Sequence, residues 1–217
     1  MTSVMFLVLI GLGTWQVHRL AWKEAILARI AAAEAAPPVP LPANPSAFVK
    51  VAIAGTWLAD RTALFGADVR DTASGPQLGA YLLEPLRRDG APPVLVDRGW
   101  VPLNVATKVA NTPGPVTVSG YVHAADTPGW FSAHDDVPGR HFYTLDPPAI
   151  GTALGLDRVA PFVLVALGPP PAEGLPIPAT HLPRPPNNHL EYALTWYGLA
   201  AALLVIFTIW ARKAVRA

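Results

Sequence analysis

The chain has 217 residues, of which 52% are hydrophobic and 14% are charged, and its formal net charge is +1 at pH 7. A charge so close to neutral argues against the broad basic surface that nucleic-acid binding requires. The absence of cysteine excludes disulfides, thiolate zinc sites and cysteine-ligated copper sites.

The N-terminal part begins with an uncharged apolar run, SVMFLVLIGLGTWQV, over residues 3–17. Such a run gives about 22 Å of helix, which is short for a bilayer span. A cleaved signal peptide is the alternative, but no basic segment precedes the run, and a cleavage-like Ala-Ala-Ala comes only after the next charged stretch. We predict an uncleaved first transmembrane helix over residues 1–18, and the missing basic flank leads us to expect a natural start further upstream.

The charged stretch that follows predicts an amphipathic juxtamembrane helix over residues 19–36, because its apolar residues recur at helical spacing. Gly13, Gln16, Arg19 and Trp22 are spaced by three and form a slowly drifting stripe. In one interpretation Arg19 extends to the lipid headgroups. In the other, Gln16 and Arg19 face the second membrane helix and line a polar site at the membrane surface.

The C-terminal part contains the clearer membrane span. Residues 193–210, ALTWYGLAAALLVIFTIW, carry no charge and give about 27 Å of helix. Three basic residues follow at once, Arg212, Lys213 and Arg216. Because such a cluster is retained in the cytoplasm, we predict a second transmembrane helix over residues 188–211 and a cytoplasmic tail over 212–217. Both termini are then cytoplasmic, and the central domain lies on the other side of the bilayer.

The central part has the composition of a β domain. All 25 prolines lie between Pro37 and Pro186, which separates it sharply from the helical ends. Strands are expected at residues 48–57, 62–65, 78–83, 93–101, 115–123 and 162–167, with one short helix at 147–156. The pattern predicts a mainly β, α+β domain over 37–167, with an antiparallel sheet that closes towards a barrel. The proline-rich residues 168–187 are expected to form an extended linker.

The sequence carries no enzyme signature, and we expect no catalysis. Phosphate-binding loops, nucleophile elbows and zinc-protease motifs are all missing from it. The paired carboxylates Asp135 and Asp136 lie in an evident turn, and His134 and His141 lack the spacing of metal ligands. Within the strand at 93–101, the simplest interpretation is a local ion pair of Asp97 with Arg98, and Arg98 packs over the indole of the nearby Trp100. The alternative is a contact of Arg98 with a partner or a propionate.

The start of the second membrane helix has a structural interpretation of its own. Asn188 followed three residues later by Glu191 resembles a capping box, in which Asn188 accepts from first-turn amides and Glu191 reaches back. This arrangement would begin the helix at a defined height and would place His189 at its first position. The motif therefore needs no ligand to explain it.

Four motifs occur together in a fixed order: Gly13-x-x-Gln16-x-x-Arg19-x-x-Trp22-Lys23, Gly55-Thr56-Trp57, Val96-Asp97-Arg98-Gly99-Trp100-Val101-Pro102 and Asn187-Asn188-His189-Leu190-x-Tyr192-Ala193-x-Thr195-Trp196. Together they resemble the surfeit locus protein 1 family of cytochrome oxidase assembly factors. The resemblance implies two membrane helices that flank a domain in the periplasm or the mitochondrial intermembrane space. With no transit peptide visible, it indicates a bacterial inner-membrane member. Asp97 departs from the family, which more often has asparagine there.

The resemblance also implies a function in respiratory chain complex IV biogenesis, the maturation of subunit I of the haem-copper terminal oxidase at the step of haem a insertion. His189 would be the axial ligand of the haem iron, since a helix N-terminus favours a neutral imidazole. Tyr192 and Trp196 share its helix face and would flank the porphyrin, with Gln16 and Arg19 opposite. Arg98 and Trp100 would contact the partner, subunit I, and a haem a synthase is a possible second partner. The alternative is a membrane-anchored scaffold, a chaperone without any cofactor.

Overall fold

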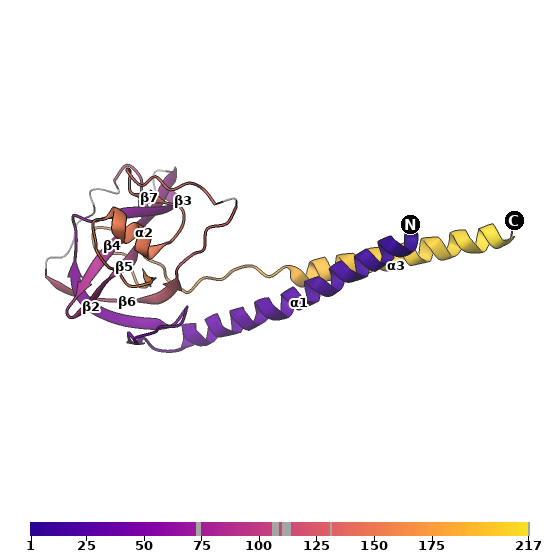
Figure 1. The fold of residues 1–217 in the computed structure, drawn as a ribbon, viewed down its shortest axis with the longest axis horizontal. Coiled ribbons are helices and arrows are strands. Elements are labelled where there is room, and N and C mark those ends of the chain that lie inside the picture. The colour runs from indigo at the N-terminus through magenta and orange to yellow at the C-terminus, as the bar shows by residue number, and fades with distance from the viewer. Residues whose placement is uncertain (73–74, 106–108, 110–113, 131, 217) are drawn as a thin grey trace. The chain divides into compact units, whose positions relative to one another are not determined.

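Figure 1 shows a computed structural model, which describes residues 1–72, 75–105, 109, 114–130 and 132–216. The chain divides into two compact units. One consists of the terminal segments Met1–Ala32 and Pro183–Ala217, and the other is the central segment Ala33–Leu182.

The terminal unit contains two long helices, α1 (Thr2–Ala35) and α3 (His189–Arg216). Both are long and apolar enough to cross a membrane, which confirms the predicted pair of transmembrane helices. The span and the amphipathic segment predicted separately are one continuous helix, α1, and α3 continues through the basic tail. Many of their large apolar side chains are exposed, such as Leu7 at 67% and Ile206 at 65%, as expected for surfaces that face lipid.

The central unit is a β domain, as predicted (Figure 1). In the described residues its strands are β1 (Val39–Pro40), β2 (Lys50–Trp57), β3 (Ala63–Thr72), β4 (Gly75–Arg88), β5 (Ala91–Pro102), β6 (Pro115–Ala124), β7 (His141–Phe142) and β8 (Phe162–Ala166). They form one sheet in the order β1-β2-β6-β8-β5-β4-β3-β7, and a further pairing of β2 with β4 closes it. The strands β2, β6, β8, β5 and β4 therefore form a barrel. Most pairings are antiparallel, but β1 with β2, β3 with β7 and β5 with β8 are parallel.

The barrel strands bury both of their faces. Alternate residues of a strand point to opposite sides of the sheet, so each strand serves two clusters. One buried cluster includes Val51, Val96 and Leu164 and draws on all five barrel strands, which places it inside the barrel. The other includes Leu95 and Val163 and packs beneath α2 (Pro147–Ala153). Double burial explains why these strands read as continuous apolar runs.

The short helix α2 has the local signals that the sequence indicated. Pro147 occupies its first turn, and the Asp146 carboxylate accepts a hydrogen bond of 3.3 Å from the Ala149 amide. Leu154 follows as the C-terminal cap, so the helix is shorter than the predicted 147–156.

Strand β4 is longer than predicted, because it continues through Pro85. Proline interrupts a strand by removing one backbone donor, but the Pro85 carbonyl still accepts from the Leu58 amide at 3.0 Å. Pro85 also stays in register with Leu95 of β5. The prediction that the strand ends before Glu84 was therefore wrong.

The proline-rich segment predicted as a free linker is attached to the barrel over much of its length. The amides of Ile177 and Trp100 each donate to the other's carbonyl at 2.9 Å, and the Ala179 amide donates to the Ala166 carbonyl at 3.1 Å. Leu182 is fully buried. Residues up to 182 consequently belong to the β domain, and only the part beyond them belongs to the terminal unit.

Candidate functional site

The terminal unit brings together two polar residues from opposite ends of the chain. His189, the first residue of α3, lies with its Nδ1 atom 2.7 Å from Oε1 of Gln16 on α1. Gln16 is only 8% exposed, although most side chains around it on α1 face outwards. Because an amide oxygen can only accept, the Nδ1 of His189 carries the proton and donates. The contact leaves Nε2 with a free lone pair in a neutral imidazole.

The same contact surface continues along the two helices away from His189. Gly13 lies one turn before Gln16 and is buried, and a Cβ added there would lie 2.7 Å from the ring of Tyr197. Thr14 Oγ1 and the Tyr197 hydroxyl are 3.2 Å apart. The predicted stripe of Gly13 and Gln16 thus faces α3, and its small residue makes room for an aromatic ring.

Arg19 does not continue this surface. Its side chain is exposed, and its guanidinium carbon lies 4.4 Å from the ring centroid of Trp22 on the same helix. This is the arrangement expected of a cation that extends along its own helix. The contact of Arg19 with a ligand stays a prediction. Trp196 is half-buried and Tyr192 is 55% exposed, so both remain accessible beside His189.

The expected capping box is not formed at the start of α3. Within the part of the chain that the structure describes, neither Asn188 nor Glu191 makes a side-chain capping bond; only the Asn188 carbonyl accepts, from the Tyr192 amide at 3.3 Å. The neighbouring Asn187 has a buried Oδ1 atom with no hydrogen-bond partner among the described residues. A buried acceptor without a donor costs about 1–3 kcal/mol, so a donor from outside the chain would stabilise this position.

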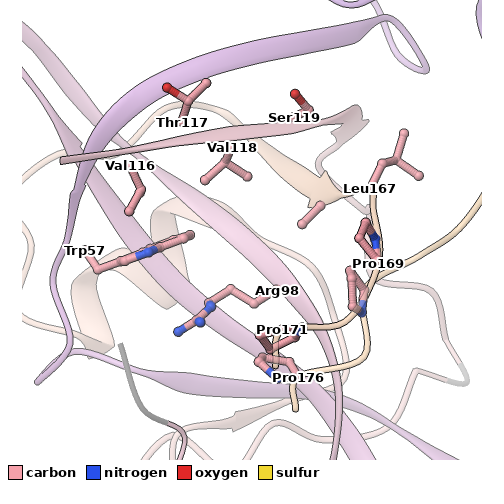
Figure 2. Close-up of a pocket in the computed structure, with 12 residues that line it drawn as sticks. Trp57, Arg98, Val116, Thr117, Val118, Ser119, Leu167, Pro169, Pro171 and Pro176 are labelled. Carbon is pink, nitrogen blue, oxygen red and sulfur yellow. The ribbon is translucent and has the colours of Figure 1, made fainter. Parts of the chain in front are cut away.

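A second polar feature lies at the mouth of the barrel (Figure 2). Arg98 donates from Nη1 to Glu84 Oε2 at 2.7 Å, and its guanidinium carbon lies 4.8 Å from the Trp57 ring centroid. The Glu84 side chain is fully buried. The cavity here measures about 310 Å³, and Figure 2 shows Pro169, Pro171 and Pro176 on the side away from Trp57.

Arg98 is partly buried in the cavity lining and Trp100 is buried, and their contact with a partner stays a prediction. Arg98 pairs with Glu84 and stacks on Trp57, not with Asp97 and Trp100 as the sequence led us to expect. Adjacent strand residues point to opposite faces, so Asp97 and Arg98 are directed apart. Trp100 is 1% exposed, and its indole Nε1 donates to the Asp68 carbonyl at 3.0 Å.

A third polar group, which the sequence reasoning did not identify, surrounds Asp97. This carboxyl is 8% exposed and lines a cavity of about 310 Å³ together with Arg70, Tyr81, Tyr121 and other residues. Asp97 Oδ1 accepts from the Gly99 amide at 2.8 Å. Burial raises the pKa of Asp97 to about 7, although the Gly99 amide and the Arg70 charge act in the opposite direction. Burial also raises the pKa of Tyr121 to about 12.

The raised pKa of Asp97 predicts an unusual dependence of stability on pH. In the unfolded chain its pKa returns to about 3.9, so the folded state holds the proton more tightly between about pH 4 and pH 7. Its contribution to stability is fully present below about pH 4 and is lost as the pH rises through 7. Asp97→Asn should therefore be stabilised relative to the wild type at pH 8. The difference in free energy of unfolding between the variant and the wild type should be up to about 4 kcal/mol larger at pH 8 than at pH 4.

Urea unfolding of the wild type and Asp97→Asn at both pH values measures this difference. Asp71→Asn is the matched control, because Asp71 is an exposed carboxylate on β3 of the same sheet. Its effect should be small and nearly the same at both pH values. Parallel pH profiles for the wild type and Asp97→Asn would show that Asp97 ionises in the folded protein as it does in the unfolded chain.

Three histidines of the β domain hydrogen-bond to backbone carbonyls in the described part of the chain. Among the described residues no group of three or more His, Asp or Glu side chains lies close enough to hold a metal ion. His141 Nε2 lies 2.7 Å from the Gly66 carbonyl, and Asp135 accepts from the Tyr143 amide at 2.6 Å. These contacts support the interpretation of the paired carboxylates as a turn.

Comparison with known proteins covers nearly the whole chain. The profile described as "SURF1 family" matches residues 3–201. A "SURF1-like protein" of Rickettsia bellii is 31% identical over 97% of this chain and 89% of its own length, and one of Rickettsia conorii is 32% identical over the same shares. "Surfeit locus protein 1" of Mus musculus is 31% identical over 95% of this chain and 72% of its own length.

The matched region includes nearly all of α1, the barrel and the first part of α3, and with them Gln16 and His189. The resemblance read from four motifs is therefore confirmed, and the chain belongs to the SURF1 family.

Proposed function

We propose that this protein is an assembly factor for the haem-copper terminal oxidase, and that it binds haem a through His189 while subunit I matures. Membership of the SURF1 family supports the first part. The single observation that carries the second is the 2.7 Å hydrogen bond between His189 Nδ1 and Gln16 Oε1. In this function the protein binds and positions a group and catalyses no reaction.

The geometry of His189 fits the chemistry of an axial ligand. Histidines that bind metals usually donate their other ring N–H to a fixed acceptor, which sets the tautomer and the orientation of the ring. Gln16 Oε1 is such an acceptor, and no hydrogen bond to His189 Nε2 occurs among the described residues. When bound, haem iron would supply an axial position for a neutral imidazole nitrogen.

The neighbours of His189 would hold and orient a flat, mostly apolar group. Tyr192 and Trp196 offer accessible rings three and seven residues further along α3. The Asn187 Oδ1 atom offers an acceptor that lacks a donor within the described chain. Arg19 is left out of the proposal, because its guanidinium stacks on Trp22.

The proposed location is the inner membrane of a bacterium, with the β domain in the periplasm. The basic residues Arg212, Lys213 and Arg216 at the end of α3 support a cytoplasmic C-terminus. His189 is then at the periplasmic end of its helix, since it begins α3. Subunit I and a haem a synthase are the partners that this location makes accessible.

The scaffold function remains the second candidate, and one observation favours it. A buried polar pair between two membrane helices stabilises their association by about 0.6–2 kcal/mol without any cofactor. The bond between Gln16 and His189 would then hold the helices together, and the protein would support subunit I by contact alone.

The visible spectrum of the purified protein decides between the two functions. From cells that make haem a, the wild type in detergent should copurify with haem a, and His189→Ala should lose it or shift its spectrum. Gln16→Leu should weaken binding or shift the spectrum, because the ring loses the acceptor that fixes its tautomer. His181→Ala is the matched control, since His181 lies in the β domain and bonds only locally, to the Leu182 carbonyl.

Haem a bound equally to the wild type and His189→Ala would reject the ligand assignment. Absence of haem from a folded wild type that still captures subunit I would establish the scaffold. Normal oxidase assembly and normal haem a content in cells without the protein would reject both functions.

A further inference from the structure

We propose that the cavity beside Asp97 is a binding site for a small organic cation, an ammonium group on a short carbon stem. The site lies entirely within the β domain, on the outer face of β5, β6 and β8. It does not depend on the function proposed for His189, because no residue is shared between the two sites.

The position of Asp97 in the sheet provides the cavity with a carboxylate. Asp97 of β5 pairs in register with Val165 of β8, and Val165 pairs with Tyr121 of β6. The three side chains therefore form one row on the same face of the sheet. Val96 and Arg98 lie on the opposite face of β5, which is directed into the barrel. The row forms part of the lining of the cavity.

Arg70, a cation in the cavity lining, is already paired with a carboxylate. Arg70 Nε donates to Asp68 Oδ2 at 3.0 Å, and its Nη2 donates to the Tyr81 hydroxyl at 3.3 Å. The Tyr81 hydroxyl in turn donates to Asp68 at 3.1 Å. Asp97, in contrast, forms no ion pair within the part of the chain described here, and its one hydrogen bond comes from the Gly99 amide. The charge that the cavity presents is thus that of Asp97, which calls for a positive ligand.

The rest of the lining suits an alkylammonium group. The rings of Phe65, Tyr81 and Tyr121 lie on the cavity wall, and aromatic rings attract cations. Leu145 and Val165 provide apolar surface for the carbon stem. The volume of about 310 Å³ is at the lower end of the range of ligand pockets, so the ligand must be small.

The buried carboxyl carries a cost that packing alone does not explain. Burial raises the pKa of Asp97 to about 7, so ionisation at neutral pH destabilises the folded domain. Because the ionised Asp97 lowers the stability of the domain, a role in ligand binding explains this residue better than a role in stability. The titratable and charged groups that face Asp97 are Arg70 from β3, Tyr81 from β4, and Tyr121 and His123 from β6, whereas β8 contributes Val165.

Calorimetric titration of the full-length protein in detergent with butylammonium chloride tests the site. At pH 8 we expect saturable binding, and below about pH 7 the affinity should fall about tenfold per pH unit, because the cation competes with a proton on Asp97. Asp97→Asn, which keeps the acceptor for the Gly99 amide, should bind at least tenfold more weakly. Asp71→Asn should bind like the wild type, and His123→Gln should keep the pH dependence.

Three outcomes would overturn the proposal: no saturable binding to the wild type, equal binding to the folded Asp97→Asn variant, or binding of acetate in place of the cation. A second titration identifies the source of the ammonium group. Binding of a capped Gly-Gly-Lys-Gly-Gly peptide as well as butylammonium would indicate a lysine side chain of a partner. Binding of butylammonium alone would indicate a free amine.

Discussion

Gly99→Ala should destabilise the β domain by about 3 kcal/mol or more and should leave little folded protein. Gly99 has φ of 120°, a backbone conformation that side chains with a Cβ rarely adopt. A Cβ added there would also collide with the backbone carbonyl of Ile177. This contact cannot give way cheaply, because Ile177 and Trp100 are joined by two backbone hydrogen bonds of 2.9 Å. The substitution would separate the proline-rich segment from the barrel.

Urea unfolding followed by tryptophan fluorescence measures this loss, and Gly90→Ala is its matched control. Gly90 also has a positive φ, 67°, but an added Cβ would meet no atom within 4 Å. Its substitution should cost only about 1–2 kcal/mol, the cost of the backbone conformation alone. If the two variants lose the same free energy of unfolding, the collision with Ile177 does not contribute to the destabilisation.

Glu84→Leu should destabilise the domain by about 3–5 kcal/mol. The Glu84 carboxylate is fully buried, and the Arg98 side chain that it meets at 2.7 Å is 13% exposed. Without the Glu84 carboxylate, the largely buried charge of Arg98 loses its ion-pair partner at the barrel mouth. The cost of breaking such a pair greatly exceeds the cost of replacing both members by apolar groups.

A double-mutant cycle tests this asymmetry directly. Glu84→Leu combined with Arg98→Met should recover most of the stability lost in Glu84→Leu alone, as measured by urea unfolding. Asp60→Asn is the control at the exposed pair of Asp60 and Arg61, whose atoms are 3.8 Å apart, and it should cost less than about 1 kcal/mol. A double variant as unstable as the sum of the single ones would show that Glu84 and Arg98 act independently.

The two cavities of the β domain lie on opposite faces of the same strand. Arg98 is directed to the barrel mouth, where Glu84 and Trp57 enclose it, and Asp97 is directed to the outer cavity. The motif around these residues therefore contributes one side chain to each of these two cavities. The two residues are adjacent in the chain, but Arg98 meets Glu84 and Trp57, whereas Asp97 accepts from the Gly99 amide.

The sequence by itself determined the features that depend on local composition and periodicity. Charge-free apolar runs predicted α1 and α3, because a membrane span needs a continuous apolar length. Runs of β-branched residues bounded by proline and glycine predicted β2, β5, β6 and β8. The stripe of Gly13 and Gln16 was predicted from helical spacing, and both residues face α3.

Only the tertiary structure decided which distant groups meet. Gln16 and His189 are 173 positions apart, and Arg98 pairs with Glu84, 14 positions earlier. Local periodicity fixes the face on which a side chain lies, but its partner depends on strand register and helix packing, which long-range burial determines. For the same reason, Asp97 could be read from the sequence as the partner of Arg98, and only the closed sheet shows it as the buried carboxyl of a separate cavity.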